Sequence, residues 1–332
     1  MDVFGIKKIY QDKPGGPQWD ALHWSNGKSR TVKPGSRDTY DPTGCTDNRG
    51  NVNWTIDGKG QLLFNVTSSG LTQPRFHLDD TSKYFFKDVE ATVYMMRVSD
   101  NNTGYGGITT GFRSSVYGHS LPQDYCEAHT YYTRIRFDSS GCDIVKEDSH
   151  PNEKAYASAK VKWPSGTSFP KNKWIGYKGV CYNSGNSVKF EIYYDLTDGK
   201  NGGDWKLLLS SADTGKWTAL PNKPPCSGHD LNAVFLEGGG VVILRNTGVS
   251  DARYKKYSVR EINPVKYEEF DCSIPPLIEY NLEDQKDEGD QDGENNKESN
   301  DQCQCGEVDF NVDDELITQI DTQSEDGWCN LI

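Results

Sequence analysis

The segment His129-Thr-Tyr-Tyr-Thr-Arg-Ile-Arg-Phe137 has the strict period-two alternation of a β-strand that lies between two different environments. Its odd-numbered residues are mostly apolar and predict the side that faces a core. The next residues, Phe137-Asp-Ser-Ser-Gly-Cys142, are typical of a hairpin turn, because Gly141 takes positive φ without strain. Two antiparallel strands joined by a tight turn are therefore predicted. The even-numbered residues, expected on the solvent side, are Thr130, Tyr132, Arg134 and Arg136.

Similar short strands are expected along most of the chain. Runs rich in Val, Ile, Tyr and Phe alternate with clusters of Gly, Asn, Asp and Pro, and we find no long amphipathic helix. The 332 residues include 33 Gly, 18 Tyr, 12 Phe and 8 Trp, a composition that favours strands and turns over helices. This rhythm is typical of an antiparallel sandwich. The expected strands are 61–66, 89–97, 108–114, 129–137, 142–146, 174–182, 188–195, 205–211, 240–246 and 254–262.

The character of the sequence changes after residue 262. We expect a β-sandwich over residues 1–265, a linker rich in Pro, Gly, Asp and Glu over 266–302, and a cysteine-containing terminal segment over 303–332. Between residues 283 and 301, nine acidic residues and two lysines supply −7 of the formal net charge of −13. Such a polar and acidic segment cannot bury a core.

The terminal segment contains one further strand pattern, Glu307-Val-Asp-Phe-Asn-Val-Asp313. Val308, Phe310 and Val312 alternate in it with polar residues. This strand could return to its own sandwich, or it could complete the sheet of another subunit as a donated strand. We expect the second arrangement, so the predicted partners are copies of the chain itself.

Two classes of partner are not expected. The longest apolar runs, such as 241–244 and 207–209, are far shorter than the roughly 18 residues that a membrane-spanning helix needs. The chain also lacks the clustered Lys and Arg residues that neutralise phosphates, so nucleic acid is not an expected partner.

Nine cysteines without a Cys-x-x-Cys pair favour disulfides in an oxidising compartment over a zinc site. An odd number leaves one thiol free or bonded to another subunit. Three glycosylation sequons, at Asn53, Asn65 and Asn101, also predict an extracellular or cell-surface protein. Because Met1-Asp-Val opens without a secretion leader, we expect a trimmed chain; a cytosolic protein with reduced thiols is the alternative. The cysteines are Cys45, Cys126, Cys142, Cys181, Cys226, Cys272, Cys303, Cys305 and Cys329.

Four segments resemble secreted concanavalin A-like proteins, a group that includes laminin-G-type modules, glycan-binding domains and polysaccharide lyases. They are Tyr105-Gly-Gly-Ile-Thr-Thr-Gly-Phe-Arg113, residues 127–137, Trp174-Ile-Gly-Tyr-Lys-Gly179 and residues 190–205. The opening Asp-x-Phe-Gly-Ile-Lys pattern, at residues 2–7, is similar to uncharacterised secreted archaeal and bacterial proteins. The resemblance covers residues 60–262 and implies an antiparallel jelly-roll β-sandwich. The expected fold class is therefore all-β, with an acidic linker and a C-terminal extension that carries an extra strand.

The solvent side of the segment 129–137 suits a surface that binds acidic sugars. Arg134 and Arg136 offer charge, and Tyr132, in the same row, offers a ring on which a sugar can stack. Arg113, on the preceding predicted strand, would extend this glycan-binding surface. The alternative is that these side chains are ordinary cross-strand pairs on a solvated face.

A uronate lyase would need a cation to neutralise the carboxylate, a base for the C5 proton and an acid for the leaving oxygen. The candidates for those roles are Tyr132, His129, His119, Arg134 and Arg136. The chain departs from the lyase motifs, since Glu127-Ala-His129 stands where Gln-x-His is expected and Tyr177-Lys178 stands where Tyr-x-Lys is expected. The Glu-x-Asp-x-x-Glu motif of the related glucanases is absent. These departures favour a protein that is not an enzyme.

One loop is a candidate for a structural calcium ion, and no cofactor is required elsewhere. Asp195, Asp198, Asn201 and Asp204 could gather oxygen ligands round Ca²⁺. The same residues, with the glycines between them, are also typical turn formers.

These observations predict an extracellular structural protein that assembles into a surface layer or filament through its terminal segment, with glycan binding as a further role. The alternative is a polysaccharide lyase that acts on an anionic, uronate-containing glycan. The acidic linker, the extra strand and the odd number of cysteines favour the first reading.

Overall fold

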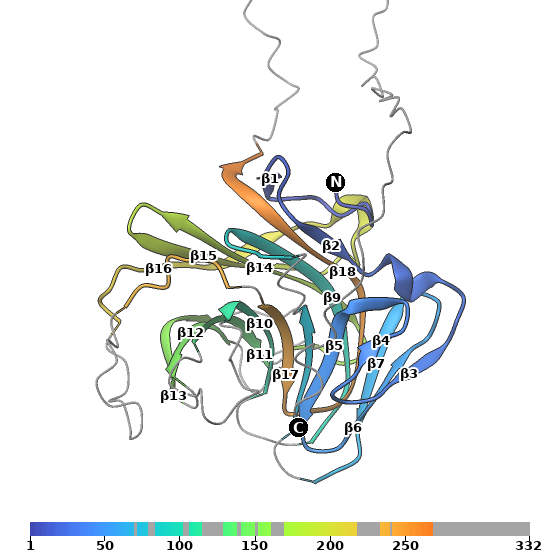
Figure 1. Cartoon of the computed structure of the whole chain (residues 1–332). Helices are drawn as coiled ribbons and strands as arrows, with labels where there is room; N and C mark the ends of the chain where they lie inside the picture. The colour runs from blue at the N-terminus through green and yellow to red at the C-terminus, as the bar shows by residue number, and fades with distance from the viewer. Residues whose placement is uncertain are drawn as a thin grey trace, which may run out of the picture. The chain divides into compact units, whose positions relative to one another are not determined.

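The computed structural model is an all-β sandwich of two antiparallel sheets, which confirms the expected fold class (Figure 1). It describes residues 1–69, 72–78, 84–101, 106–114, 129–137, 141–149, 152–160, 169–217, 233–239 and 241–267. Within these ranges the helical elements are two 3₁₀ turns, η1 (Leu22–Ser25) and η3 (Lys200–Gly202). No helix in the same ranges is long and apolar enough to cross a membrane.

The first sheet has ten strands, in the order β16-β15-β14-β9-β18-β7-β6-β3, with β1 and β2 both paired to β18. Strand β18 is therefore the one that holds the N-terminal strands and the two halves of the sheet together. The bounds are β1 (Tyr10–Asp12), β2 (Gln18–Asp20), β3 (Arg30–Val32), β6 (Val52–Ile56), β7 (Gln61–Val66), β9 (Val89–Asp100), β14 (Trp174–Ser184), β15 (Ser187–Asp195), β16 (Lys206–Asp213) and β18 (Val249–Lys266).

The second sheet has eight strands, in the order β13-β12-β11-β10-β17-β8-β5-β4. The expected hairpin is present, since β11 pairs with β12 from Thr130–Glu147 to Ile135–Cys142. The bounds are β4 (Arg37–Asp38), β5 (Asp41–Arg49), β8 (Gln73–Leu78), β10 (Gly107–Ser114), β11 (Thr130–Arg136), β12 (Gly141–Ser149), β13 (Asn152–Lys160) and β17 (Val241–Thr247).

All ten strands expected from the sequence are present, and the strands that the sequence did not reveal are short or carry residues that disfavour strands. Strand β8 contains Pro74, and β5 begins Asp41-Pro-Thr-Gly. Strand β18 extends to Lys266, the first residue of the predicted linker 266–302. Residues 268–302 of that linker, the terminal segment 303–332 with Val308, Phe310 and Val312, and His119 lie outside the described residues. Assembly through the terminal strand therefore stays a prediction.

The core between the sheets is rich in aromatic residues. Tyr131 of β11 and Phe190 of β15 meet across it with ring centroids 4.8 Å apart, and both are fully buried. At the other end, Trp19 packs edge-on against Tyr257 at 5.1 Å. Large rings span the space between sheets with few side chains, and each buries much apolar area. This explains how a chain with few Leu and Ala residues builds a core.

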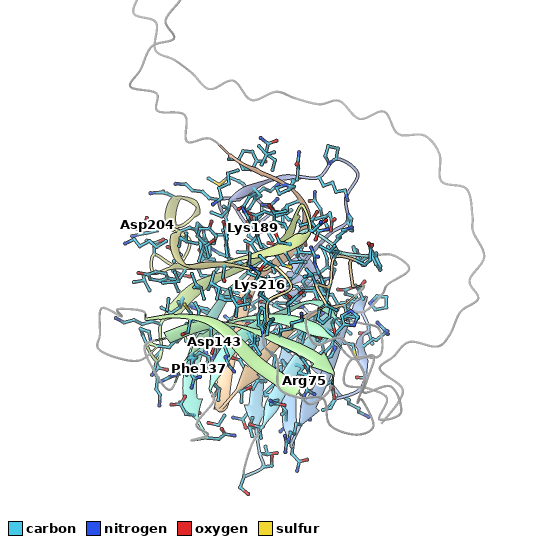
Figure 2. The ribbon with its side chains drawn as sticks, turned by 90° about the vertical axis from the view of Figure 1, so that its left-hand side faces the viewer. Arg75, Phe137, Asp143, Lys189, Asp204 and Lys216 are labelled. Atoms are coloured by element: carbon cyan, nitrogen blue, oxygen red, sulfur yellow. The ribbon has the colours of Figure 1, made fainter. Side chains whose placement is uncertain are left out.

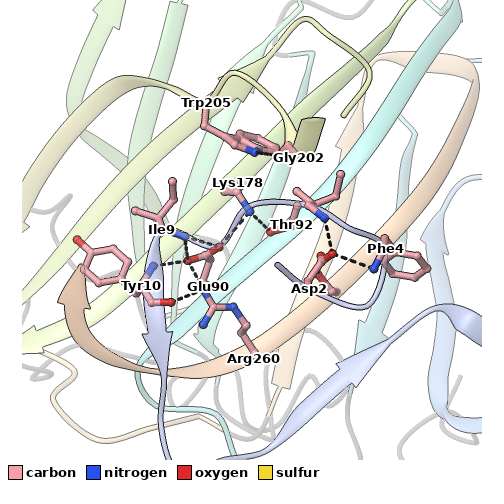
Figure 3. A network of polar contacts seen from close by, with 12 residues as sticks. Asp2, Phe4, Ile9, Tyr10, Glu90, Thr92, Lys178, Gly202, Trp205 and Arg260 are labelled. Atoms are coloured by element: carbon pink, nitrogen blue, oxygen red, sulfur yellow. Dashed lines mark hydrogen bonds and ion pairs between the residues drawn. The ribbon is translucent and has the colours of Figure 1, made fainter. Parts of the chain in front are cut away.

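A buried carboxylate fixes the N-terminal segment on the outer face of the ten-stranded sheet (Figure 3). Glu90 of β9 accepts hydrogen bonds from the backbone N–H groups of Ile9 and Tyr10. Its two oxygens also lie 3.0 Å from Lys178 Nζ and 2.6 Å from Arg260 Nη2. The side chain of Glu90 is 0% exposed, so the ion pairs are sheltered from solvent screening.

We expect Glu90→Gln to lower the free energy of unfolding by about 3 kcal/mol, because two buried cations then lose their shared counter-charge. Urea unfolding followed by tryptophan fluorescence measures this. Glu237→Gln is the matched control, since the Glu237 side chain is 92% exposed and lies 3.7 Å from Lys87. Equal losses in the two variants would contradict the role assigned to Glu90.

Candidate functional site

Charged and polar side chains gather on the face of the eight-stranded sheet that points away from the core. Their neighbours in the chain, such as Ile108, Ile135 and Leu244, belong to the core, so alternation turns these side chains outward. Figure 2 labels two of them, Arg75 and Asp143. We call this surface the polar face. Its members are Asp47, Arg75, His77, Thr109, Tyr132, Arg134, Arg136, Asp143, Glu147 and Arg245.

Strand order places residues from distant parts of the chain in one row across the polar face. Thr109 of the central strand β10 is opposite Arg134 on one side and Arg245 on the other. The row ends in a carboxylate on each side, so the arginines lie in its middle and the aspartates at its two ends. In order along the row the residues are Asp47, Arg75, Arg245, Thr109, Arg134 and Asp143.

Two arginines of the polar face share a single carboxylate. Arg134 binds Asp143 in a bidentate pair, with Nε–Oδ1 at 2.7 Å and Nη2–Oδ2 at 2.6 Å. Arg136 Nη1 lies 3.7 Å from the same Oδ2. The side chains of Arg134 and Arg136 are 12% and 24% exposed, whereas that of Asp143 is 4% exposed. The accessible part of this trio is therefore the positive part.

The expectation that Tyr132 is exposed for sugar stacking is wrong, because the side chain is fully buried. Its hydroxyl donates a hydrogen bond to Glu147 at 2.8 Å, and the guanidinium of Arg245 lies 4.3 Å from the ring centroid. Tyr132 lies on β11 and Arg245 on β17, the two strands that flank β10. Their side chains meet above Gly111 of β10, which has no side chain to separate them. A Cβ at Gly111 would lie 3.1 Å from the Tyr132 ring.

The hydroxyl of Thr109 is buried at the centre of the row and makes no hydrogen bond with the described residues. A buried polar atom without a partner costs free energy, and such atoms in native proteins mark places where water or a ligand binds. Thr109 lies between Arg134 and Arg245 in the strand pairing, so its hydroxyl and Arg75 Nε are atoms of the polar face with spare hydrogen-bonding capacity.

Among the candidate lyase residues that the structure describes, His129 lies apart from the other three. Tyr132, Arg134 and Arg136 lie on the polar face, whereas His129 packs its ring 4.4 Å from that of Phe235. Alternation puts His129 on the same side of β11 as the core residue Tyr131. A general acid or base must lie within hydrogen-bond reach of the substrate, and His129 does not share the arginines' side.

Arg113 also leaves the expected surface. Its φ of 54° and the bulge between β10 and β17 turn the chain, so the side chain points between the sheets. There the guanidinium lies 3.0 Å from an Asp88 oxygen and donates a hydrogen bond of 2.6 Å to Asn183. Arg113 is 1% exposed and is a structural residue. Its predicted part in glycan binding is wrong.

Several members of the polar face were not found from sequence. Arg75 and His77 alternate with Phe76 and Leu78, and Arg245 follows Leu244, so the signal was alternation within short strands. What the sequence does not reveal is that β8 and β17 lie beside β10. Residues that are far apart in the sequence can be recognised as neighbours only when the order of strands in the sheet is known.

The predicted calcium loop is held by hydrogen bonds from the protein. The buried carboxylate of Asp195 accepts from the backbone N–H groups of Thr197, Gly199 and Asp204, and from the Thr197 and Tyr94 hydroxyls. Asp198 pairs with Lys255 at 2.7 Å, and Asn201 takes φ of 53° in the turn. Within the described ranges no three His, Cys, Asp or Glu residues are placed to hold a metal ion. The hydrogen bonds thus describe a turn whose central anion is already satisfied.

Two of the nine predicted disulfide cysteines are free thiols. Cys142 lies on β12 and Cys181 on β14, and both side chains are in the core. Burial raises the pKa of each thiol to about 11. The disulfide prediction is therefore wrong for Cys142 and Cys181. The cysteines outside the described residues are Cys126, Cys226, Cys272, Cys303, Cys305 and Cys329.

A pocket of about 270 Å³ lies on the outer face of the ten-stranded sheet, between the N-terminal segment, β2 and β18. Its charged side chains already have hydrogen-bond partners within the protein. Asp2 accepts a hydrogen bond from Ser258, and Lys8 and Arg260 both lie within 2.6 Å of Asp12 oxygens. This pocket therefore offers less unused polar capacity to a ligand than the polar face does.

No family model and no curated protein matches the chain. Among solved structures, the Emp46p carbohydrate recognition domain in its metal-free form is 8% identical, covers 75% of this chain and 98% of its own, and has a TM-score of 0.42. The VIP36 exoplasmic/lumenal domain in its Ca²⁺/Man2-bound form is 10% identical, covers 72% and 90%, and has a TM-score of 0.41. Lectin II from Ulex europaeus is 9% identical, covers 71% and 99%, and has a TM-score of 0.36.

We expect Asp195→Asn to destabilise the fold by about 1–3 kcal/mol at pH 7, since an amide cannot accept all of these hydrogen bonds. Desolvation raises the pKa of Asp195, but the hydrogen bonds outweigh it and bring the pKa below its ordinary value. A carboxylate with a lowered pKa stabilises the fold above about pH 4 and loses this effect as pH falls through its folded pKa. Urea unfolding at pH 7 and pH 3 should show the gap between wild type and variant shrinking at acid pH.

Asp204→Asn is the control for this comparison, because its side chain is 66% exposed and should change stability little at either pH. A gap for Asp195→Asn that stays constant with pH would contradict the assignment of the charged carboxylate as the centre of the turn.

We expect both core thiols to resist alkylation in the native protein, because burial and the raised pKa leave almost no accessible thiolate at pH 8. Iodoacetamide labelling with and without urea, followed by peptide mass spectrometry, measures this. Cys142 and Cys181 should be labelled only after unfolding. Rapid labelling of either cysteine in the native state would show that its segment of the core opens.

Proposed function

We propose that the chain is an extracellular, non-catalytic glycan-binding protein that holds anionic sugars on the polar face. The observation that carries the proposal is the trio of Arg134, Arg136 and Asp143, in which two cations share one buried anion and remain partly exposed. A sugar carboxylate or sulfate could accept hydrogen bonds from these partly exposed guanidinium groups. Arginine binds such planar anions through paired, charge-assisted hydrogen bonds.

Exposure along the row limits where a ligand can bind. Arg75, Arg245 and Thr109 are at most 8% exposed, whereas the side chains of Arg134 and Arg136 are 12% and 24% exposed. We therefore place the charged group of the ligand at Arg134 and Arg136.

Binding is better supported than lysis. Tyr132 is buried with its hydroxyl donated to Glu147, and His129 lies on the opposite side of β11 from the arginines. A lyase would need a base and an acid beside the bound uronate. Self-assembly through Val308, Phe310 and Val312 has no support from the described residues and stays a separate prediction.

A location outside the cell is supported by two features. Asn53 and Asn65, which belong to sequons, are exposed. Cys45 is not a free thiol, and we propose that it forms a disulfide with a cysteine outside the described residues. Peptide mapping under non-reducing conditions would identify that partner.

We expect the protein to bind polygalacturonate or alginate in calorimetry at low salt, and to bind neutral dextran much more weakly. Arg136→Gln should weaken binding of the acidic glycan about tenfold, the loss of one charge-assisted hydrogen bond worth about 1.4 kcal/mol. Absorbance for unsaturated uronate should stay flat in the same samples.

Lys189→Gln is the matched control, because it removes one positive charge from an exposed position of β15 in the other sheet (Figure 2). If this variant and Arg136→Gln weaken binding equally, the attraction is general charge and the proposed site is wrong. Absence of binding to both acidic polysaccharides would contradict the function itself.

A further inference from the structure

The structure brings two of the three sequon asparagines together as direct cross-strand partners. Asn53 of β6 is opposite Asn65 of β7 in an antiparallel pair. Both side chains are exposed. In such pairs the Cβ atoms of opposite residues are about 4.5–5.5 Å apart, and both side chains leave the same face of the sheet. The two modification sites, twelve positions apart in sequence, therefore compete for one patch of surface.

The packing below this patch fixes its register. Trp54 and Phe64 are also cross-strand partners, and their ring centroids lie 5.4 Å apart in the core. Both are at most 1% exposed. A slip of one residue would bring these rings to the surface, so alternation holds the adjacent Asn53 and Asn65 outward and opposite each other.

The surroundings of the two asparagines differ. Asn65 lies between Asn53 on β6 and Asp251 on β18. On the far side of β6, pairing with β3 runs from Arg30–Ile56 to Val32–Trp54 and ends there. Asn53 thus has a cross-strand neighbour on one side only among the described strands, and a glycan on it can lean over that open side.

The third sequon is in a different situation. Asn101 is partly buried, and its Nδ2 donates a hydrogen bond of 2.6 Å to Thr72 Oγ1. N-glycosylation joins the sugar to this same nitrogen. A glycan at Asn101 would require the side chain to leave its present contacts, so this site does not share the exposure of the other two.

We infer that the folded protein carries a single N-linked glycan on this patch, at Asn53, and that this glycan excludes a second one at Asn65. Neighbouring strands are about 4.8 Å apart, and a hexosamine ring with its acetamido group fills that width. Two such rings on opposite asparagines, whose Cβ atoms are about 4.5–5.5 Å apart, would crowd each other. The open side next to Asn53 decides which of the two is used. This inference does not depend on the glycan-binding function.

The test is site occupancy in the full chain secreted from a eukaryotic cell that adds N-glycans. Treatment with an endoglycosidase that leaves one hexosamine on each modified asparagine, followed by intact-mass and peptide mass spectrometry, reports which sites are occupied on one molecule. We expect Asn53 to be occupied and Asn65 to be unmodified. In Asn53→Gln and in Thr55→Ala, either of which removes the first sequon, Asn65 should become occupied.

Asn101→Gln is the control and should leave occupancy at both other sites unchanged. Folded molecules modified at both Asn53 and Asn65 would overturn the inference, as would modification of neither. Occupancy of Asn65 in place of Asn53 in the wild type would overturn the assigned preference. An Asn65 that stays bare in both Asn53→Gln and Thr55→Ala would show that exclusion is not the cause.

Discussion

The carboxylate of Glu90 is the contact on which the arrangement of the ten-stranded sheet depends most. It lies on β9, and its partners come from β14, from β18 and from the backbone of the N-terminal segment. A buried charge must be compensated where it lies, because solvent cannot do so. Lys178 meets this need with Glu90 and the Thr92 hydroxyl, and Arg260 with Glu90 and Asp12. Four segments that are far apart in the chain are thus held in one geometry by one anion.

The two sheets treat their outward charges differently. On the ten-stranded sheet the N-terminal segment covers the charges, and every polar atom of the Glu90 network described above has a partner. On the polar face Arg134 and Arg136 remain partly exposed beside the buried Asp143, and the Thr109 hydroxyl has no partner among the described residues. A covered and satisfied network stabilises the fold, whereas partly exposed cations can also bind a ligand. This difference is why we place the site on the eight-stranded sheet.

Two adjacent residues of β11 show that the core and the polar face are separated by a single step along a strand. Tyr131 points into the core and donates a hydrogen bond to Asp213 at 2.6 Å, where Lys146 also lies 2.9 Å from the same oxygen. Tyr132, one residue later, points to the polar face and donates to Glu147. Both hydroxyls are buried and both donate to a carboxylate. Alternation along β11 decides that Tyr131 lies in the core and Tyr132 on the polar face. The face of a residue on β11 therefore determines whether it belongs to packing or to the site.

The sequence by itself determined the all-β class, the positions of ten strands, the hairpin between β11 and β12, and the outward direction of Arg134 and Arg136, because alternation and turn residues are local signals. It could not show that Arg245 covers Tyr132, or that a bulge turns Arg113 inward, since both depend on which strands become neighbours. It marked Asn53 and Asn65 as separate sequons, and only the pairing of β6 with β7 placed them opposite each other. Sheet order is decided by packing across the whole chain, so contacts between distant segments exist only in the tertiary structure.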